Sequence, residues 1–162
     1  MHGAVTLRLA SRDDIACLAA WDEDPVVRAC SGEADMGDWA DELAMPWQEV
    51  LIGEEDGRPV GVVVVLDPAA EPDRYWGEID ETVRAIDIWI GHADDRSRGI
   101  GQILMQAAAA RCFADPQVTA ILIDPLESNI AARRFYARLG YVDLGGRRFG
   151  ADLCRVMRLD RP

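Results

Sequence analysis

The stretch Arg96-Ser97-Arg98-Gly99-Ile100-Gly101 decides the fold of this chain. It follows an apolar run that predicts a strand, 85–90, and precedes a helix-like run, 100–113. Because glycine has no Cβ atom, Gly99 and Gly101 let the backbone come close to a bound group. The first amides of a helix have no internal partners and carry the positive end of its dipole. The stretch therefore predicts a pyrophosphate site, with a plain turn that starts a helix as the alternative.

The spacing of these glycines argues against two familiar phosphate loops. A dinucleotide fingerprint needs a third glycine three residues after Gly101, where this chain has Leu104. A nucleoside triphosphate loop needs Gly-Lys-Ser or Gly-Lys-Thr, and the chain contains neither. The pattern that fits is (Gln/Arg)-x-x-Gly-x-(Gly/Ala), which begins at Arg96. It resembles the acyl-coenzyme A pyrophosphate loop of the GNAT N-acetyltransferase superfamily.

A second stretch, 124–141, carries a similar signal. It contains Asn129, then Arg134-Phe135-Tyr136, then Gly140-Tyr141. This pattern resembles the second half of a GNAT acetyltransferase. The two motifs together cover about residues 85–141.

Three stretches narrow the resemblance to one group of enzymes within this superfamily. The stretches 83–91 and 115–125 are similar to stretches of aminoglycoside 6′-N-acetyltransferases, and Tyr75-Trp76-Gly77-Glu78 resembles the aromatic-acidic patch ahead of them. Ala85 and Ile123 depart from the usual residues of that group. These departures leave open which drugs the enzyme would modify, and they do not change the class of enzyme that the resemblance implies.

The resemblance implies acetyl-coenzyme A as co-substrate, bound where the strands near 85–90 and 118–123 splay apart. Its pantetheine arm would enter this gap and pair with the backbone of the first strand. Asn129 would bind the arm, or would simply cap the following helix. The residues implied to contact the cofactor are Ile88, Trp89, Ile90, Arg96, Arg98, Gly99, Ile100, Gly101, Gln102, Asn129 and Tyr136.

Asp87 is the first candidate for catalysis. Successive side chains of a strand point to opposite faces, so Ile86 and Ile88 face one way and Asp87 the other. A carboxylate in an apolar inner strand costs free energy unless it is solvated or paired. The alternatives are a cleft residue and a strand-end carboxylate bound to an arginine or an amide. The resemblance favours the cleft, where Asp87 would hold the substrate ammonium and help to remove its proton. Because an Asp beside a cation is a weak base, its role as base or as anchor stays open.

Two further residues complete the expected site. Tyr136 is similar to the tyrosine that GNAT enzymes place near the coenzyme A sulfur, where a phenol would donate a proton to the leaving thiolate. The alternative for Tyr136 is packing beside Phe135. Asp124 ends a strand that we expect beside the Asp87 strand, so both carboxylates would bind an acceptor with several amines. The alternative for Asp124 is an ordinary Asp-Pro turn.

The acidic segment from Asp67 to Asp87 supplies the remaining substrate candidates. Trp76, Glu78 and Asp80 would stack on and pair with a polycationic sugar, unless the segment is only a solvated loop. Trp39 and Trp47 would line the opposite side, although core packing is favoured for both.

The composition predicts one domain over residues 1–162, with a formal net charge of −12. This charge makes nucleic acid a poor partner and favours a cationic small molecule. The chain has no run of about twenty apolar residues and no signal-peptide pattern, so we expect no membrane contact and a cytoplasmic protein. Four scattered cysteines make a metal site or a redox site unexpected. We expect a monomer or a homodimer.

The patterns predict an α/β domain with a mixed central sheet of about six to seven strands flanked by helices, and the resemblance makes this a GNAT-like fold. The expected strands are 5–9, 50–53, 59–66, 85–90, 118–123, 141–147 and 151–159. The expected helices are 12–21, 26–30, 39–45, 100–113 and 130–139. The expected turns and loops are Asp56-Gly57, 67–82 and Asp35-Met36-Gly37.

The main hypothesis is an acetyl-coenzyme A dependent N-acetyltransferase that modifies the 6′-amino group of aminoglycosides and so confers resistance. Transfer would be direct, so Cys112 and Cys154 are not expected to act as nucleophiles. One alternative is the same chemistry on another amine, such as a siderophore precursor or a polyamine. The other is a noncatalytic acyl-coenzyme A binding module.

Overall fold

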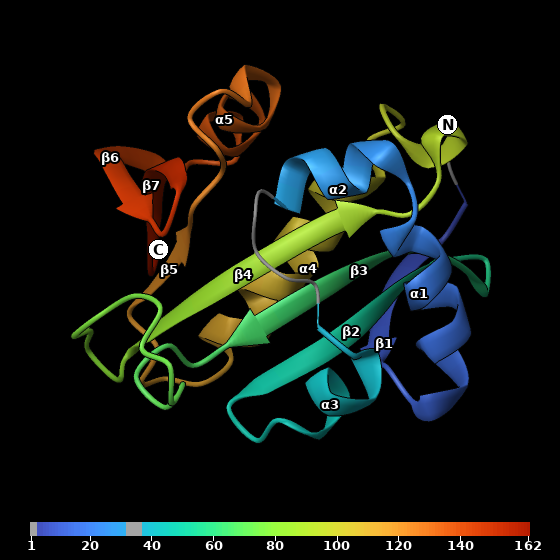
Figure 1. Cartoon of the computed structure of the whole chain (residues 1–162), viewed down its shortest axis with the longest axis horizontal. Helices are drawn as coiled ribbons and strands as arrows, with labels where there is room; N and C mark the ends of the chain where they lie inside the picture. The colour runs from blue at the N-terminus through green and yellow to red at the C-terminus, as the bar shows by residue number, and fades with distance from the viewer. Residues whose placement is uncertain (1–2, 32–36) are drawn as a thin grey trace.

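The computed structural model describes residues 3–31 and 37–162 of the chain (Figure 1). Asp35 and Met36 of the expected loop lie outside the described residues. The strands are β1 Val5–Leu9, β2 Gln48–Glu55, β3 Arg58–Leu66, β4 Val83–Ile90, β5 Ala120–Ile123, β6 Val142–Phe149 and β7 Asp152–Asp160. The helices are α1 Ile15–Asp22, α2 Pro25–Ser31, α3 Trp39–Ala44, α4 Ile100–Phe113 and α5 Ile130–Arg138, with short 3-10 helices η1 Arg12–Asp14 and η2 Ala93–Asp95.

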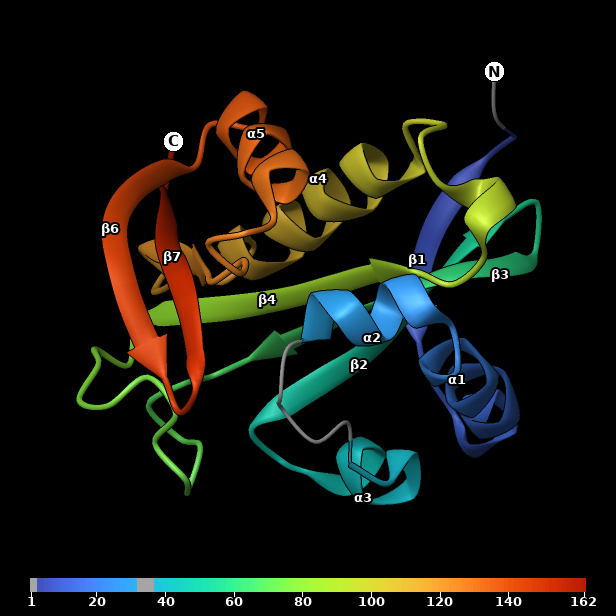
Figure 2. The same cartoon turned by 45° about the horizontal axis from the view of Figure 1, so that its top comes forward.

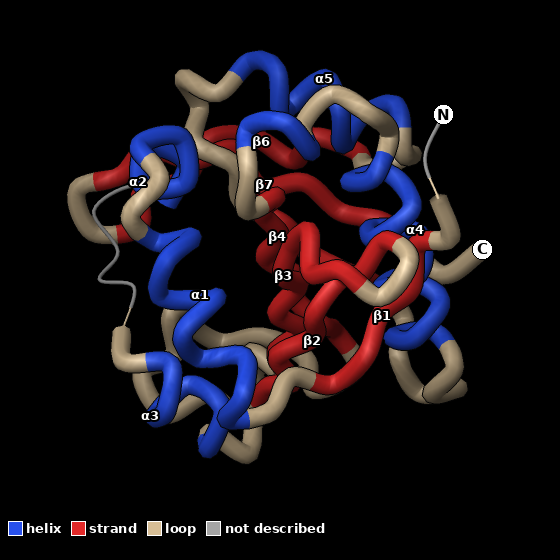
Figure 3. Tube along the Cα trace, turned by 90° about the vertical axis from the view of Figure 1, so that its right-hand side faces the viewer, coloured by secondary structure: helices blue, strands red, loops and turns tan. Residues whose placement is uncertain are grey.

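The seven strands form one sheet in the order β1-β2-β3-β4-β5-β7-β6. Every neighbouring pair is antiparallel except β4 and β5, which are parallel. In Figure 2, α1, α2 and α3 lie on one face of the sheet, and α4 and α5 lie on the other. Figure 3 shows the same layers from the side. The predicted mixed α/β sheet flanked by helices is confirmed.

Each face of the sheet has its own apolar core. On one face, Leu104 of α4 packs with Val63 and Ile121 of the strands. On the other face, Leu18 and Trp21 of α1 pack with the strands. Because β3 is covered on both faces, all its residues from Val60 to Val65 are buried, which confirms the inner strand that its apolar run predicts.

Local signals set the ends of several elements. The Asn129 side chain accepts a hydrogen bond from the Ala132 N–H at 3.1 Å and so caps α5. Gly140 follows α5 with a φ of +98°, the left-handed conformation expected after a helix. The strand β5 begins two residues later than predicted, at Ala120, because the Val118 N–H bonds to the Asp115 carbonyl in a turn.

The strands β4 and β5 pair over a short seam and then separate. Their paired residues run from Val83 with Ala120 to Ala85 with Leu122. The rest of β4 continues to Ile90 and, among the described residues, pairs only with β3 on its other side. This geometry confirms the expected splay and leaves one edge of β4 without a neighbouring strand in the part of the chain that the structure describes.

Among residues 3–31 and 37–162, none of the helices has both the length and the apolar character that a membrane span requires.

Candidate active site

A cleft of about 1150 Å³ opens where β4 leaves β5. Its floor is β4 from Ala85 to Ile90, and one wall is the start of α4 with the loop before it. The opposite walls come from α2, α3, α5 and the turn between β6 and β7. The cleft therefore joins the glycine loop to the strand that carries Asp87.

The glycine loop has the backbone geometry of an anion site. Gly99 is the N-cap of α4 with a φ of +82°, and no heavy atom lies within 4 Å of the place where a Cβ would stand. The Ile103 N–H bonds to the Gly99 carbonyl at 3.4 Å, so the amides of 100–102 precede the first bond of the helix. Open space beside helix-start amides that have no hydrogen-bond partner among residues 3–31 and 37–162, at the positive end of a 14-residue helix, fits a diphosphate.

Nine of the expected cofactor residues line the cleft, and two do not. Those in the cleft are Ile88, Trp89, Ile90, Arg96, Gly99, Gly101, Gln102, Asn129 and Tyr136. The Ile100 side chain is instead buried in the core, so Ile100 can contribute only its backbone amide.

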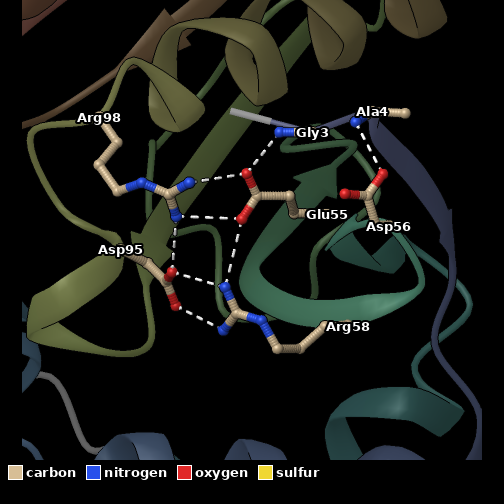
Figure 4. Close-up of polar contacts among 7 residues, drawn as sticks. All are labelled: Gly3, Ala4, Glu55, Asp56, Arg58, Asp95 and Arg98. Atoms are coloured by element: carbon tan, nitrogen blue, oxygen red, sulfur yellow. Dashed lines mark hydrogen bonds and ion pairs between the residues drawn. The ribbon is translucent and has the colours of Figure 1, made fainter. Parts of the chain in front are cut away.

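The Arg98 side chain does not line the cleft and bonds instead to carboxylates of the fold (Figure 4). Its guanidinium donates to Glu55 Oε1 at 2.8 Å and to Asp95 Oδ1 at 3.0 Å. Arg58 donates to the same two carboxylates, and the Gly3 N–H also bonds to Glu55. Because both carboxylates are buried, they hold the arginines more firmly than a solvent-facing ligand would. Arg98 therefore fixes the loop from behind.

Arg96 supports the same loop from the cleft side. Its guanidinium donates to the Ile90 carbonyl at 3.2 Å and pairs with Asp24 at 3.0 Å. The Asp24 carboxylate also accepts the Val26 N–H at 2.9 Å, at the start of α2. Arg96 thus connects the end of β4 with the helix on the opposite wall.

Asp87 and Asp124 form an acidic centre in the cleft. The Asp87 side chain is exposed to the cleft, on the face of β4 where Trp89 packs against Trp39 with ring centroids 5.9 Å apart. Desolvation by the surrounding walls raises the pKa of Asp87 to about 7, and the charges of Asp124 and Glu42 add to the rise. Burial likewise raises the pKa of Asp124 to about 6.

Tyr136 packs beside Phe135, as one of its two predictions has it, and also lines the cleft. Its ring packs against Phe135 and Tyr141, with centroids 5.2 Å and 5.9 Å away, and the residue also lines the cleft. Burial, and then the charge of Asp87, raises the pKa of Tyr136 above its usual value. The phenol is therefore neutral near pH 7 and is a hydrogen-bond donor.

The acidic loop reaches the cleft only in part. Trp76 lines the cleft, but it is buried and packs edge-on against Phe149 with centroids 5.1 Å apart. Glu78 and Asp80 do not line the cleft, so the structure does not bring them together with Asp87 and Asp124. Asp80 instead accepts the Thr82 N–H at 2.8 Å and closes a local turn.

The sequence left Trp39 and Trp47 between the cleft wall and the core, and the structure puts the two side chains in different places. Trp39 is buried in the core beneath the cleft, and it also contributes to the cleft wall. Trp47 lines a different hollow of about 220 Å³ and takes no part in the cleft.

Among the cleft residues that the sequence analysis did not assign to the site are Glu42, Glu71 and Tyr75, whose side chains are polar. Glu42 lies three residues after Trp39, so the helical spacing could have placed both on one face. Glu71 and Tyr75 lie within the loop that the sequence assigned to binding. The Glu71 Oε2 atom is buried without a hydrogen-bond partner among the described residues, and burial raises the pKa of this group. A buried carboxylate of this kind is suited to a cationic ligand.

Within the part of the chain that the structure describes, no three His, Cys, Asp or Glu residues are grouped as metal ligands.

Comparison with known proteins agrees with this geometry. Residues 10–149 match the acetyltransferase (GNAT) domain family. An aminoglycoside N(6′)-acetyltransferase type 1 of Klebsiella pneumoniae is 32% identical over 150 residues, which cover 86% of this chain and 75% of that protein. A kanamycin resistance protein of Rhizobium radiobacter is 39% identical over 72 residues, 44% of this chain and 67% of that protein.

Solved structures give the same relationship. The aminoglycoside acetyltransferase AAC(6′)-Ib in complex with coenzyme A and kanamycin superposes with a TM-score of 0.87 at 28% identity, over 98% of this chain and 95% of that chain. AAC(6′)-Ib in complex with paromomycin and acetyl-coenzyme A gives 0.88 at 29% identity, over 98% and 94%. With a family match over most of its length, and relatives that are aminoglycoside N(6′)-acetyltransferases, this chain belongs to the GNAT acetyltransferase family.

Proposed function

We propose that this chain transfers the acetyl group of acetyl-coenzyme A to the 6′-amino group of an aminoglycoside. One observation carries the proposal: a single cleft joins the glycine-loop helix start to the carboxylates around Asp87. The first feature suits a diphosphate, and the second suits a substrate with several ammonium groups. The names of the related proteins, aminoglycoside N(6′)-acetyltransferases, support the same substrate class.

The chain offers two backbone surfaces to the cofactor. The amides of Gly99 to Gln102 would hold its diphosphate, with Arg96 beside them. The free edge of β4 from Ile88 to Ile90 would hold the pantetheine arm. When bound, acetyl-coenzyme A supplies the activated acetyl thioester.

Asp87 has the environment of a proton acceptor at neutral pH. An alkyl ammonium must lose a proton before its nitrogen can attack a carbonyl. An ionised Asp87 binds the ammonium, and its raised pKa of about 7 makes it a better base than an ordinary aspartate. The raised pKa of Asp87 supports the proposal that it acts as a base and not only as an anchor.

Tyr136 would serve the leaving group. It lies in the same cleft as Asp87, and the Asp87 carboxylate contributes to its raised pKa. Because the phenol keeps its proton, it can donate a hydrogen bond to the thiolate that leaves.

The other carboxylates of the cleft would select the acceptor. Glu42 and Glu71 come from the α3 side and the loop, and Asp124 comes from the end of β5. Charges on several sides of one cleft match a cation with amines on different rings better than a simple amine.

The four cysteines are free, and we place the enzyme in the cytoplasm for this reason.

The test is an acetylation assay with purified protein. Thiol release from acetyl-coenzyme A is followed with kanamycin, hydroxylysine and spermidine in parallel, and the acetylated position is read by NMR. We expect turnover with kanamycin and a product modified at the 6′-amine. Turnover with hydroxylysine or spermidine alone would replace the aminoglycoside with another amine. Cofactor binding without turnover on any acceptor would indicate a noncatalytic module.

A further inference from the structure

A hydrogen bond spans the acceptor side of the cleft. The Tyr75 hydroxyl, from the loop 67–82, donates to Asp124 Oδ2 at 2.6 Å. The Tyr75 ring is fixed from behind, because it stacks on Phe149 with centroids 4.4 Å apart and planes 9° from parallel. Trp76 meets the Tyr75 ring edge-on at 5.8 Å. Tyr75 thus connects the loop to Asp124 at the end of β5, while its ring stacks on Phe149 of β6.

We propose that Tyr75 is a positioning residue that orients Asp124 and keeps it negatively charged for the ammonium of the acceptor. This inference rests on the proposed function, because it assigns Asp124 to acceptor binding. A carboxylate has two oxygens, so a hydrogen bond to one of them fixes the plane of the group and leaves the other for a ligand.

The surroundings of Asp124 explain why it needs such a donor. Burial opposes its charge, and a second carboxylate, Asp87, lies in the same cleft. Groups of this kind resist simultaneous ionisation. The bond from Tyr75 acts in the opposite direction and lowers the pKa of Asp124. The titratable and charged groups around Asp124 are Tyr75 from the loop, Asp87 from β4, Tyr136 from α5, Arg147 from β6, and Asp152 and Cys154 from β7.

The chemistry of the donor is suited to a cationic substrate. An arginine at this place would also keep Asp124 ionised, but its positive charge would repel the acceptor. A phenol stabilises the carboxylate and adds no charge. Burial and the charge of Asp124 raise the pKa of Tyr75, so the phenol keeps its proton across the working pH range.

The test compares Tyr75→Phe with wild type. The substitution keeps the ring and its stack on Phe149 and removes only the hydroxyl. We expect kcat/KM for kanamycin at pH 6.5 to fall about five- to tenfold, as for one lost charge-assisted hydrogen bond. The acid limb of the pH profile should move to higher pH, and KM for acetyl-coenzyme A should stay unchanged. Tyr141→Phe is the matched control, because its buried hydroxyl has no hydrogen-bond partner among the described residues.

Two further measurements isolate the Tyr75–Asp124 pair. The double variant Tyr75→Phe/Asp124→Asn should have the same kcat/KM as Asp124→Asn alone, because the Tyr75 hydroxyl acts only through Asp124. In the free protein, carboxyl NMR should show Asp124 titrating at higher pH in Tyr75→Phe than in wild type.

The outcomes separate this inference from the proposed function. An unchanged acid limb, additive losses in the double variant, or tighter kanamycin binding by Tyr75→Phe would overturn the role of Tyr75. Wild type without turnover on aminoglycosides would instead refute the proposed function. The NMR titration reads the Tyr75–Asp124 pair in either case.

Discussion

Asp87 places a carboxylate in a strand whose neighbours are apolar, and the chain loses stability by keeping it there. The walls of the cleft raise its pKa from the ordinary 3.8 to about 7. Between these two values the folded protein binds a proton that the unfolded chain does not. Folding stability attributable to Asp87 therefore falls as pH rises from about 4 to about 7. The residue is retained at this cost because an ionised carboxylate is needed at the acceptor.

The first prediction concerns Asp87→Asn. Below about pH 7 the wild-type carboxylate is protonated, so its kcat/KM for the acceptor should fall as pH drops. Asp87→Asn should lower kcat at pH 7.5 by about 100-fold or more and remove the part of this limb that belongs to Asp87, leaving the part that belongs to Asp124. Its Tm at pH 7.5 should rise by about 2–5 °C, because a charge that the cleft walls desolvate is gone.

Asp73→Asn is the control for this variant, since Asp73 is an exposed carboxylate of the acidic loop outside the cleft. It should keep the wild-type pH profile. A wild-type rate in Asp87→Asn, measured by thiol release, would show that the proton leaves by another route.

The second prediction concerns Tyr136→Phe. Loss of the phenol should lower kcat about tenfold and change KM for the acceptor little, because the hydroxyl acts on the leaving thiolate. The rings of Phe135 and Tyr141 should hold the new side chain in place. Steady-state kinetics with both substrates varied would check this, and an unchanged kcat would refute the role.

At the scale of elements, the loop before α4 is held from two sides. Buried Glu55 and Asp95 hold Arg98 behind it, and Asp24 holds Arg96 in front. The loop therefore offers its amides in a fixed arrangement before any ligand binds. Such preorganisation lowers the entropy that binding costs.

The third prediction concerns Gly99→Ala. The φ of +82° at Gly99 disfavours a Cβ, and the space that a Cβ would fill is the space assigned to the diphosphate. The variant should lose about 1 kcal/mol of stability and raise KM for acetyl-coenzyme A about tenfold or more. Isothermal calorimetry with coenzyme A and thermal unfolding measure the two effects.

Gly57→Ala is the matched control, because Gly57 has a φ of +81° and equally open surroundings at the β2–β3 turn. It should lose similar stability and leave the cofactor affinity unchanged. Equal losses of affinity in both variants would trace the effect to general destabilisation rather than to the loop.

The sequence predicts the helices and strands well, but it does not predict side-chain hydrogen bonds between residues that lie far apart in the chain. Capping by Asn129, the left-handed Gly140 and the alternation around Asp87 follow from local rules, and all three are observed. The bond from Arg98 to Glu55 could not be predicted, because the two residues lie 43 positions apart and only the fold brings them together. The local turn at Asp80 could not be predicted either, because a polar loop does not reveal which carboxylates face inward.

At the scale of the whole molecule, the charge of −12 and the acidic cleft act in the same direction on a cationic acceptor. Surface and cleft charges attract the substrate before contact, and dissolved ions screen this attraction.

The fourth prediction is a salt dependence. Between about 50 and 500 mM NaCl, KM for kanamycin should rise several-fold while kcat at saturation changes little. Glu42→Gln removes one charge from the cleft wall and should make this dependence shallower. A KM that is independent of salt would show that the carboxylates act only by direct contact.

The short pairing of β4 with β5 divides the sheet into two parts, one of β1, β2, β3 and β4 and one of β5, β7 and β6. The strands of the second part come last in the sequence. Until Ala120 to Leu122 emerge and dock, the bare side of β4 stands open along its full length to any extended peptide nearby. A chain that ends after α4 should therefore self-associate more readily than the full chain, because the uncovered edge of β4 can pair with another strand.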